Sequence, residues 1–66
     1  MSMLKEPGYY ITESDNILIL YPEINGDQYM ETNNDHSNNK WIRTKLSELT
    51  LIMINLNKSF DYIGEL

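Results

Sequence analysis

The chain has 66 residues, a net charge of −5, no cysteine and one histidine. We therefore expect a single small domain over residues 1–66 that neither a disulfide nor a thiolate-bound zinc ion stabilises. The first residues lack the apolar stretch of a signal peptide, and no apolar run reaches the length of a membrane span. These features predict a protein of the cytoplasm, in a bacterium or a phage-infected cell, that does not contact a membrane.

The charge is unevenly distributed along the chain. Residues 1–39 carry seven carboxylates and one lysine, whereas residues 40–66 carry four Lys or Arg residues against three carboxylates. An acidic surface repels nucleic acid and attracts the basic surface of another protein. The alternative interpretation is that these carboxylates only keep the protein soluble.

The N-terminal third predicts a short tail followed by a β-hairpin. Residues 1–8 contain a Pro-Gly pair and are expected to form a flexible tail. Residues 9–13 are rich in aromatic and β-branched side chains, which favours a first strand. Residues 14–16, Ser-Asp-Asn, are typical of a turn, and the apolar run 17–21 predicts a second strand.

Two further strands are expected in the middle of the chain. Asn25-Gly26 is the favoured pair for a tight type I′ turn, because both residues there need a positive φ. Residues 28–32 would form the third strand and residues 41–46 the fourth. Between them, the seven polar residues 33–39 predict a loop with nothing to bury.

The C-terminal part predicts a helix and then a final strand. Ser47 is a natural N-cap for a helix over about residues 47–59. Apolar residues at positions i, i+3, i+4, i+7 and i+11 form one stripe, which we expect to face the sheet, and a shorter pair is expected to face outward. The stripe consists of Leu49, Ile52, Met53, Leu56 and Phe60, and the outward pair of Leu51 and Ile54. From residue 60 onward the two-residue period of a strand takes over.

Together these elements predict an α+β fold. It consists of a small antiparallel sheet, a meander of about four strands, with one C-terminal amphipathic helix against one face. The final short strand would join the sheet, with the first strand as a candidate neighbour.

The second strand is apolar on both faces, although one helix covers only one face of a sheet. An antiparallel strand with one face in water should alternate apolar and polar residues. Three alternatives follow: a small exposed patch, two copies that stack their sheets, or a different protein that docks there. For a homo-oligomer such as a homodimer, the expected interface residues are Ile17, Ile19, Tyr21, Leu51 and Ile54.

No pattern of catalytic, metal-binding or cofactor-binding residues is present. The chain has no nucleophile elbow and no phosphate-binding loop. His36 follows Asp35 in a polar loop without a second histidine, which favours a solvated residue over a metal ligand. A basic cluster around Trp41 could stack on bases, but the excess of carboxylates argues against direct nucleic-acid binding. We therefore expect no enzyme activity, no cofactor and no metal ion.

The resulting functional expectation is a small acidic protein-binding module without catalysis. More narrowly, we expect an inhibitor or adaptor from a phage or mobile element that occupies a basic, nucleic-acid-binding surface of a bacterial host protein, as anti-restriction and anti-CRISPR inhibitors do. The expected acidic footprint consists of Glu13, Asp15, Glu23, Asp27, Glu31 and Asp35. The alternative is a structural or regulatory homo-oligomer that uses the apolar sheet face as its interface.

Overall fold

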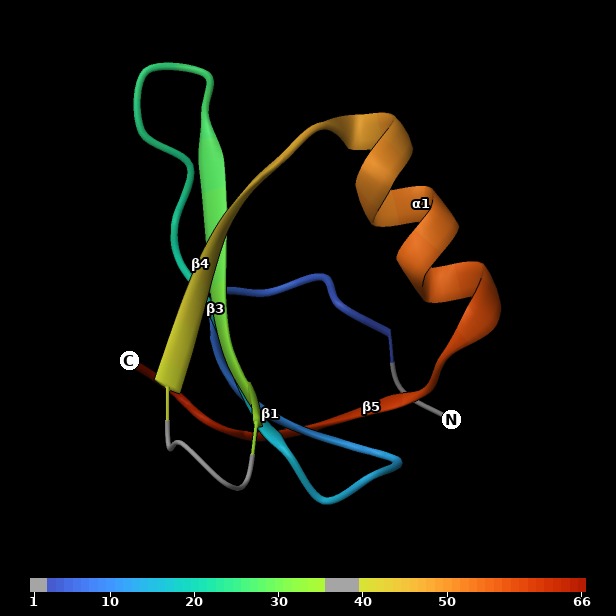
Figure 1. Ribbon diagram of the computed structural model, residues 1–66. Helices are drawn as coiled ribbons and strands as arrows, with labels where there is room; N and C mark the ends of the chain where they lie inside the picture. The colour runs from blue at the N-terminus through green and yellow to red at the C-terminus, as the bar shows by residue number, and fades with distance from the viewer. Residues whose placement is uncertain (1–2, 36–39) are drawn as a thin grey trace.

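The computed structural model describes residues 3–35 and 40–66, which form five strands and one helix. All strand pairs are antiparallel, and the sheet order is β4-β3-β2-β1-β5, with α1 against one face (Figure 1). This confirms the predicted α+β fold, with the final strand at the sheet edge beside β1. The elements are β1 (Gly8–Thr12), β2 (Ile17–Leu20), β3 (Gln28–Asp35), β4 (Lys40–Leu46), α1 (Glu48–Asn57) and β5 (Phe60–Gly64).

The two expected turns form where the local sequence favours them. Asn25 and Gly26 have φ angles of 53° and 83°, and the backbones of Ile24 and Asp27 exchange hydrogen bonds of 2.7 and 2.9 Å across the turn. A tight turn with two positive φ angles confirms the predicted type I′ geometry. Asp15, in the β1–β2 turn, also has a positive φ of 61°, which Asp tolerates better than most residues.

The third strand is longer than predicted. β3 continues through residues 33–35, which we had assigned to a polar loop, and Asp35 pairs with Lys40 of β4. Backbone pairing with β4 does not require apolar side chains, so the polar sequence concealed this part of the strand. Residues 36–39, including His36, lie outside the described residues.

The N-terminal segment packs against the body of the protein, so the prediction of a flexible tail is wrong for residues 4–8. Leu4 is 2% exposed and belongs to the core, and Gly8 already begins β1. The Asn55 side chain accepts a hydrogen bond from the Leu4 N–H (2.8 Å) and donates one to the Leu4 carbonyl (3.1 Å). The Tyr10 hydroxyl accepts a hydrogen bond from the Glu6 N–H (3.0 Å) and donates one to the carbonyl of the same residue.

The helix begins as predicted, but it presents the opposite face to the sheet. Ser47 is the N-cap and accepts a hydrogen bond from the Thr50 N–H at 3.2 Å. Leu51 and Ile54, expected to face outward, pack against the core. The predicted inward stripe is exposed along α1, at 69% for Leu49, 50% for Ile52, 54% for Met53 and 76% for Leu56.

Two features explain this reversal. The helix is apolar on almost every side, so its sequence contains two apolar stripes and periodicity alone does not select one. Asn55 shares a helix face with Leu51 and Ile54, and its amide finds two hydrogen-bond partners in the backbone of Leu4. Satisfying that amide beside the N-terminal segment turns the face with Leu51 and Ile54 inward.

The core is small for a sheet of this width. No residue of α1 is fully buried, and Phe60, the last member of the predicted stripe, reaches the core from β5 instead. The buried apolar residues are Leu4, Tyr10, Leu18, Leu20, Leu46 and Phe60. Each of them therefore contributes strongly to a free energy of unfolding that is expected to be modest in a chain of this length.

Gly8 is predicted to be a position where only glycine is tolerated. Its φ is +153°, and a Cβ atom would lie 2.5 Å from the Gly64 carbonyl oxygen and 2.5 Å from Cε1 of Tyr62. We expect Gly8→Ala to lower the free energy of unfolding by about 2 kcal/mol or more, through backbone strain and steric overlap.

Gly64→Ala is the matched control, because its Cβ would meet nothing within 4 Å. Urea denaturation of both variants measures the effect, and the control should stay within about 0.5 kcal/mol of the unmodified protein. Equal losses in the two variants would contradict the assigned packing at Gly8.

Candidate functional site

The sheet has an outer face, which we define as the side turned away from α1 (Figure 1). Alternation along the strands places on it the residues between those of the core. Within the described part of the chain, no segment packs over this face. Its principal residues are Tyr9, Ile11, Ile17, Ile19, Tyr21, Tyr29, Glu31, Trp41, Arg43 and Lys45.

The register divides the outer face into two halves of different chemistry. Over β1 and β2 the half is apolar, because Tyr9 pairs with Ile19 and Ile11 pairs with Ile17. Over β3 and β4 it is aromatic and charged, since Glu31 pairs with Arg43 and Tyr29 with Lys45. A partner would therefore meet an apolar surface beside a polar one.

Arg43 is the central charged group of the polar half. Its guanidinium carbon lies 4.7 Å from the centre of the Tyr29 ring and 5.6 Å from that of Tyr21. These are distances of cation–π contacts, which hold the guanidinium beside the two tyrosine rings. Burial, together with the nearby Glu31 carboxylate, raises the pKa of Tyr21 above its ordinary value. Tyr21 therefore stays neutral across the physiological pH range.

The structure separates the five predicted interface residues into two groups. Ile17, Ile19 and Tyr21 lie together on the outer face, each half-buried. Leu51 and Ile54 lie on the other side of the sheet and pack against the core, so the five do not form one surface.

Sequence reasoning missed several members of the outer face. Tyr9 and Tyr29 flank the predicted patch on the neighbouring strands, and Arg43 lies beyond them on β4. Side chains alternate between the two faces on every strand of a sheet. Applying this alternation to the strands predicted beside β2 would have placed these residues on the same face as Ile17 and Ile19.

The six predicted acidic residues do not form one footprint either. Glu13 and Asp15 lie in the β1–β2 turn, and Asp35 ends β3 at the same end of the sheet. Glu23 and Asp27 lie at the opposite end, beside the tight turn between β2 and β3. Glu31, between these two ends, belongs to the outer face itself. The carboxylates of Glu13, Asp15, Glu23 and Asp27 therefore lie at the two ends of the outer face.

Besides Glu31, which hydrogen-bonds to Tyr21, Glu13 and Asp27 already have partners within the protein. Glu13 accepts hydrogen bonds from the Ser59 hydroxyl (2.7 Å) and from the Ser59 N–H (2.9 Å), and these bonds lower the pKa of the Glu13 carboxyl. Asp27 forms an exposed ion pair with Lys45 at 3.2 Å. Both groups are thus less available to a partner than the sequence suggested.

A polar atom at the rim of the outer face lacks a partner. The buried Oδ1 atom of Asn16 accepts no hydrogen bond from the described residues. Asn16 lines a small depression with Ile17 and Trp41. Buried acceptors are usually satisfied, so this atom is an exception within the described part of the chain.

Residues 3–35 and 40–66 contain no group of three or more His, Cys, Asp or Glu side chains able to hold a metal ion. In the same residues, no helix is both long enough and apolar enough to cross a membrane.

No protein-family model matches the chain, and the comparisons with curated proteins and with solved structures also find no match. Function must therefore be inferred from the surface chemistry of this chain.

The Glu13–Ser59 hydrogen bonds predict a pH-dependent stability. Because they lower the pKa of Glu13 below its ordinary value of 4.5, the folded protein binds fewer protons there than the unfolded chain does. Their stabilising effect is present above pH 4.5 and is lost as the pH falls through the lowered pKa of the folded state. We expect Glu13→Gln to be less stable than the unmodified protein at pH 7, with the difference shrinking on acidification.

Thermal unfolding from pH 7 to pH 3 measures this effect. Glu23→Gln is the control, because Glu23 is exposed and forms no hydrogen bond or ion pair with other described residues. It should follow the unmodified protein at every pH. A Glu13→Gln curve that also coincides with the unmodified protein would contradict the assigned role of Glu13.

Proposed function

We propose that the protein is a small protein-binding module without catalytic activity and that the outer face is its contact surface. The observation that carries the proposal is this uncovered sheet face, where apolar side chains of β1 and β2 lie beside Arg43 and its two tyrosines. Contiguous apolar patches of this kind on small proteins often mark interaction sites.

The composition of the face supports this function over simple exposure. A solvated antiparallel face normally carries polar residues between the core positions, but Ile17 and Ile19 occupy those positions on β2. Tyrosine, tryptophan and arginine are enriched in protein–protein interfaces and dominate their binding energies. The outer face combines all three types around a β-branched centre.

The charge supports a partner with a basic surface. The net charge is −5, and carboxylates flank the outer face at both of its ends. Such a distribution speeds association with a positively charged protein and orients the encounter. More narrowly, we propose an inhibitor or adaptor of phage or mobile-element type that acts in the bacterial cytoplasm and covers a nucleic-acid-binding surface, as anti-restriction and anti-CRISPR inhibitors do.

One observation favours a second candidate, a homo-oligomer that stacks outer faces. Glu31 and Arg43 are neighbours near the middle of this face, so it carries both charge signs. A two-fold axis through the face would bring Arg43 of one copy toward Glu31 of the other, as an isologous interface requires.

A single surface substitution tests the outer face. Tyr9 is 37% exposed, so Tyr9→Lys should leave the fold intact while placing a charge in the apolar half. We expect this variant to lose a partner that the unmodified protein captures from bacterial lysate. The control is Leu49→Lys, an equivalent change at a position of α1 that is 69% exposed, which should retain the partner.

Light scattering of the purified protein separates the two candidates. A monomer is expected for the heterologous module, whereas a dimer that Tyr9→Lys converts to monomers would establish the homo-oligomer. If Tyr9→Lys changes neither the mass nor the captured proteins, the outer face is not the contact surface.

Neutralising free carboxylates tests the charge argument separately. The double variant Asp15→Asn and Glu23→Gln removes one negative charge at each end of the outer face and avoids the engaged carboxylates of Glu13, Asp27 and Glu31. We expect slower association with the captured partner and a weaker dependence of binding on salt. An association rate equal to that of the unmodified protein at low salt would show that the acidic ends do not contribute.

A further inference from the structure

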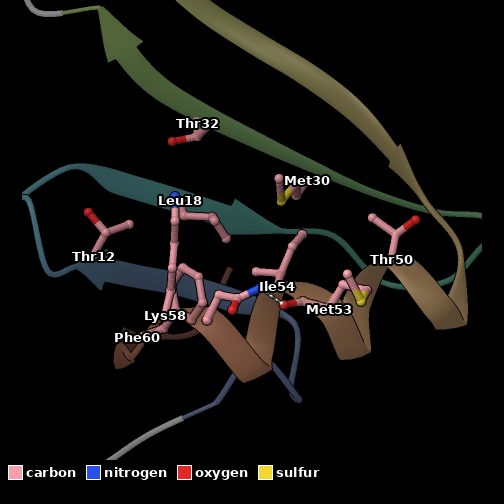
Figure 2. Close-up of a pocket in the computed structure, with 10 residues that line it drawn as sticks. Thr12, Leu18, Met30, Thr32, Thr50, Met53, Ile54, Lys58 and Phe60 are labelled. Atoms are coloured by element: carbon pink, nitrogen blue, oxygen red, sulfur yellow. Dashed lines mark hydrogen bonds between the residues drawn. The ribbon is translucent and has the colours of Figure 1, made fainter.

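A cleft of about 290 Å³ lies between α1 and the sheet, on the side opposite the outer face. Its apolar wall consists of Leu18, Met30, Met53, Ile54 and Phe60, which Figure 2 shows converging from the helix and from three strands. The cleft is thus bounded partly by core residues, although it opens to the surface beside the exposed Met53.

The cleft exists because the helix rests on the sheet through few side chains. Leu51 and Ile54 pack against the core, and Asn55 ties the helix to the N-terminal segment. No residue of α1 is fully buried. The part of the helix that lies between these contacts and β5 is therefore not packed tightly on β2 and β3, and the cleft occupies this space.

Lys58 gives the cleft its electrostatic character. Among residues 3–35 and 40–66 it is the only charged one that lines the cleft, in a protein whose net charge is −5. Figure 2 shows its side chain extending from the end of α1 across to the sheet, with its nitrogen drawn beside Leu18, so its aliphatic stem adds to the lining. Within the described part of the chain, no ion pair is found for this ammonium.

Glu13, which senses the charge of Lys58, does not form an ion pair with it. Glu13 interacts with it only through space, as the weakest influence on the Glu13 carboxyl, which is held by the hydrogen bonds from Ser59. The remaining polar groups at the cleft, such as the hydroxyls of Thr12 and Thr50, are uncharged. A bound anion would therefore find one cation, Lys58, and no carboxylate among the described residues that line the cleft.

We infer that this cleft binds an aliphatic carboxylate, whose chain lies against Leu18, Ile54 and Phe60 and whose carboxylate pairs with the Lys58 ammonium. Water occupies ~30 Å³ per molecule in the liquid, so the cleft holds about ten non-hydrogen atoms. Octanoate has that size. The inference is independent of the outer face, because the two surfaces lie on opposite sides of the sheet.

An NMR titration of the uniformly ¹⁵N-labelled protein with octanoate tests the inference. We expect saturable shifts of the Leu18, Ile54 and Phe60 amides, and weaker binding of the neutral octanol and of the cationic octylammonium. Lys58→Gln should weaken octanoate binding by about five- to tenfold and leave octanol binding unchanged. The matched control is Lys45→Gln, which removes the same charge from the other side of the sheet and should bind octanoate normally.

Several outcomes would overturn the inference. Equal affinity for octanoate and octanol would show that Lys58 does not select an anion. Shifts confined to the outer face, or shifts that never saturate, would show non-specific adsorption. If dilution of the protein alone moves the same three resonances, a second copy of the chain occupies the cleft instead.

Discussion

The arrangement of the helix depends on one pair of hydrogen bonds, those between the Asn55 amide and the backbone of Leu4. A polar amide that is withdrawn from water needs partners, and these two bonds engage both its NH₂ group and its oxygen. They hold the N-terminal segment between the helix and the sheet, which brings Leu4 into the core. They also determine which side of α1 faces inward, and hence which apolar residues remain in water. The cleft beside Lys58 lies next to these contacts, and Ile54 contributes both to the core packing and to the cleft wall.

Strands, turns and fold class were predictable because their determinants are local. Asn25-Gly26 specifies its turn through two positive φ angles, and the short apolar run of residues 17–21 favours a strand whatever its neighbours are. The orientation of the helix was not predictable in this way. It depends on the hydrogen bonds between Asn55 and Leu4, which are 51 positions apart in sequence. Leu4 had been assigned to a flexible tail, so this contact was not expected. The same error assigned Leu51 and Ile54 to an interface, although both support the core.

The candidate site was predicted in part for a related reason. Ile17, Ile19 and Tyr21 were correctly grouped on one side of β2, since strand alternation is local. Their neighbours across the sheet depend on register, which the sequence leaves open until the hairpins are aligned. The acidic footprint failed as a single surface because closeness along the chain does not imply closeness in an antiparallel sheet, where successive turns lie at opposite ends. Glu13 and Asp27 additionally found partners in Ser59 and Lys45, which no local pattern indicated.

The edges of the sheet explain why its outer face is the better candidate for association. Both edge strands could in principle pair with another chain, but β4 carries Arg43 and Lys45 and β5 contains a register irregularity opposite Tyr9 and Tyr10. Charged side chains and bulges of this kind oppose edge-to-edge pairing. The outer face has no such protection over β1 and β2, where its residues are apolar. β2 carries core residues on one side and Ile17 and Ile19 on the other, so substitutions within it would disturb fold and surface together. Tyr9 and Lys58, each at the margin of its own surface, are therefore the positions at which binding can be separated from folding.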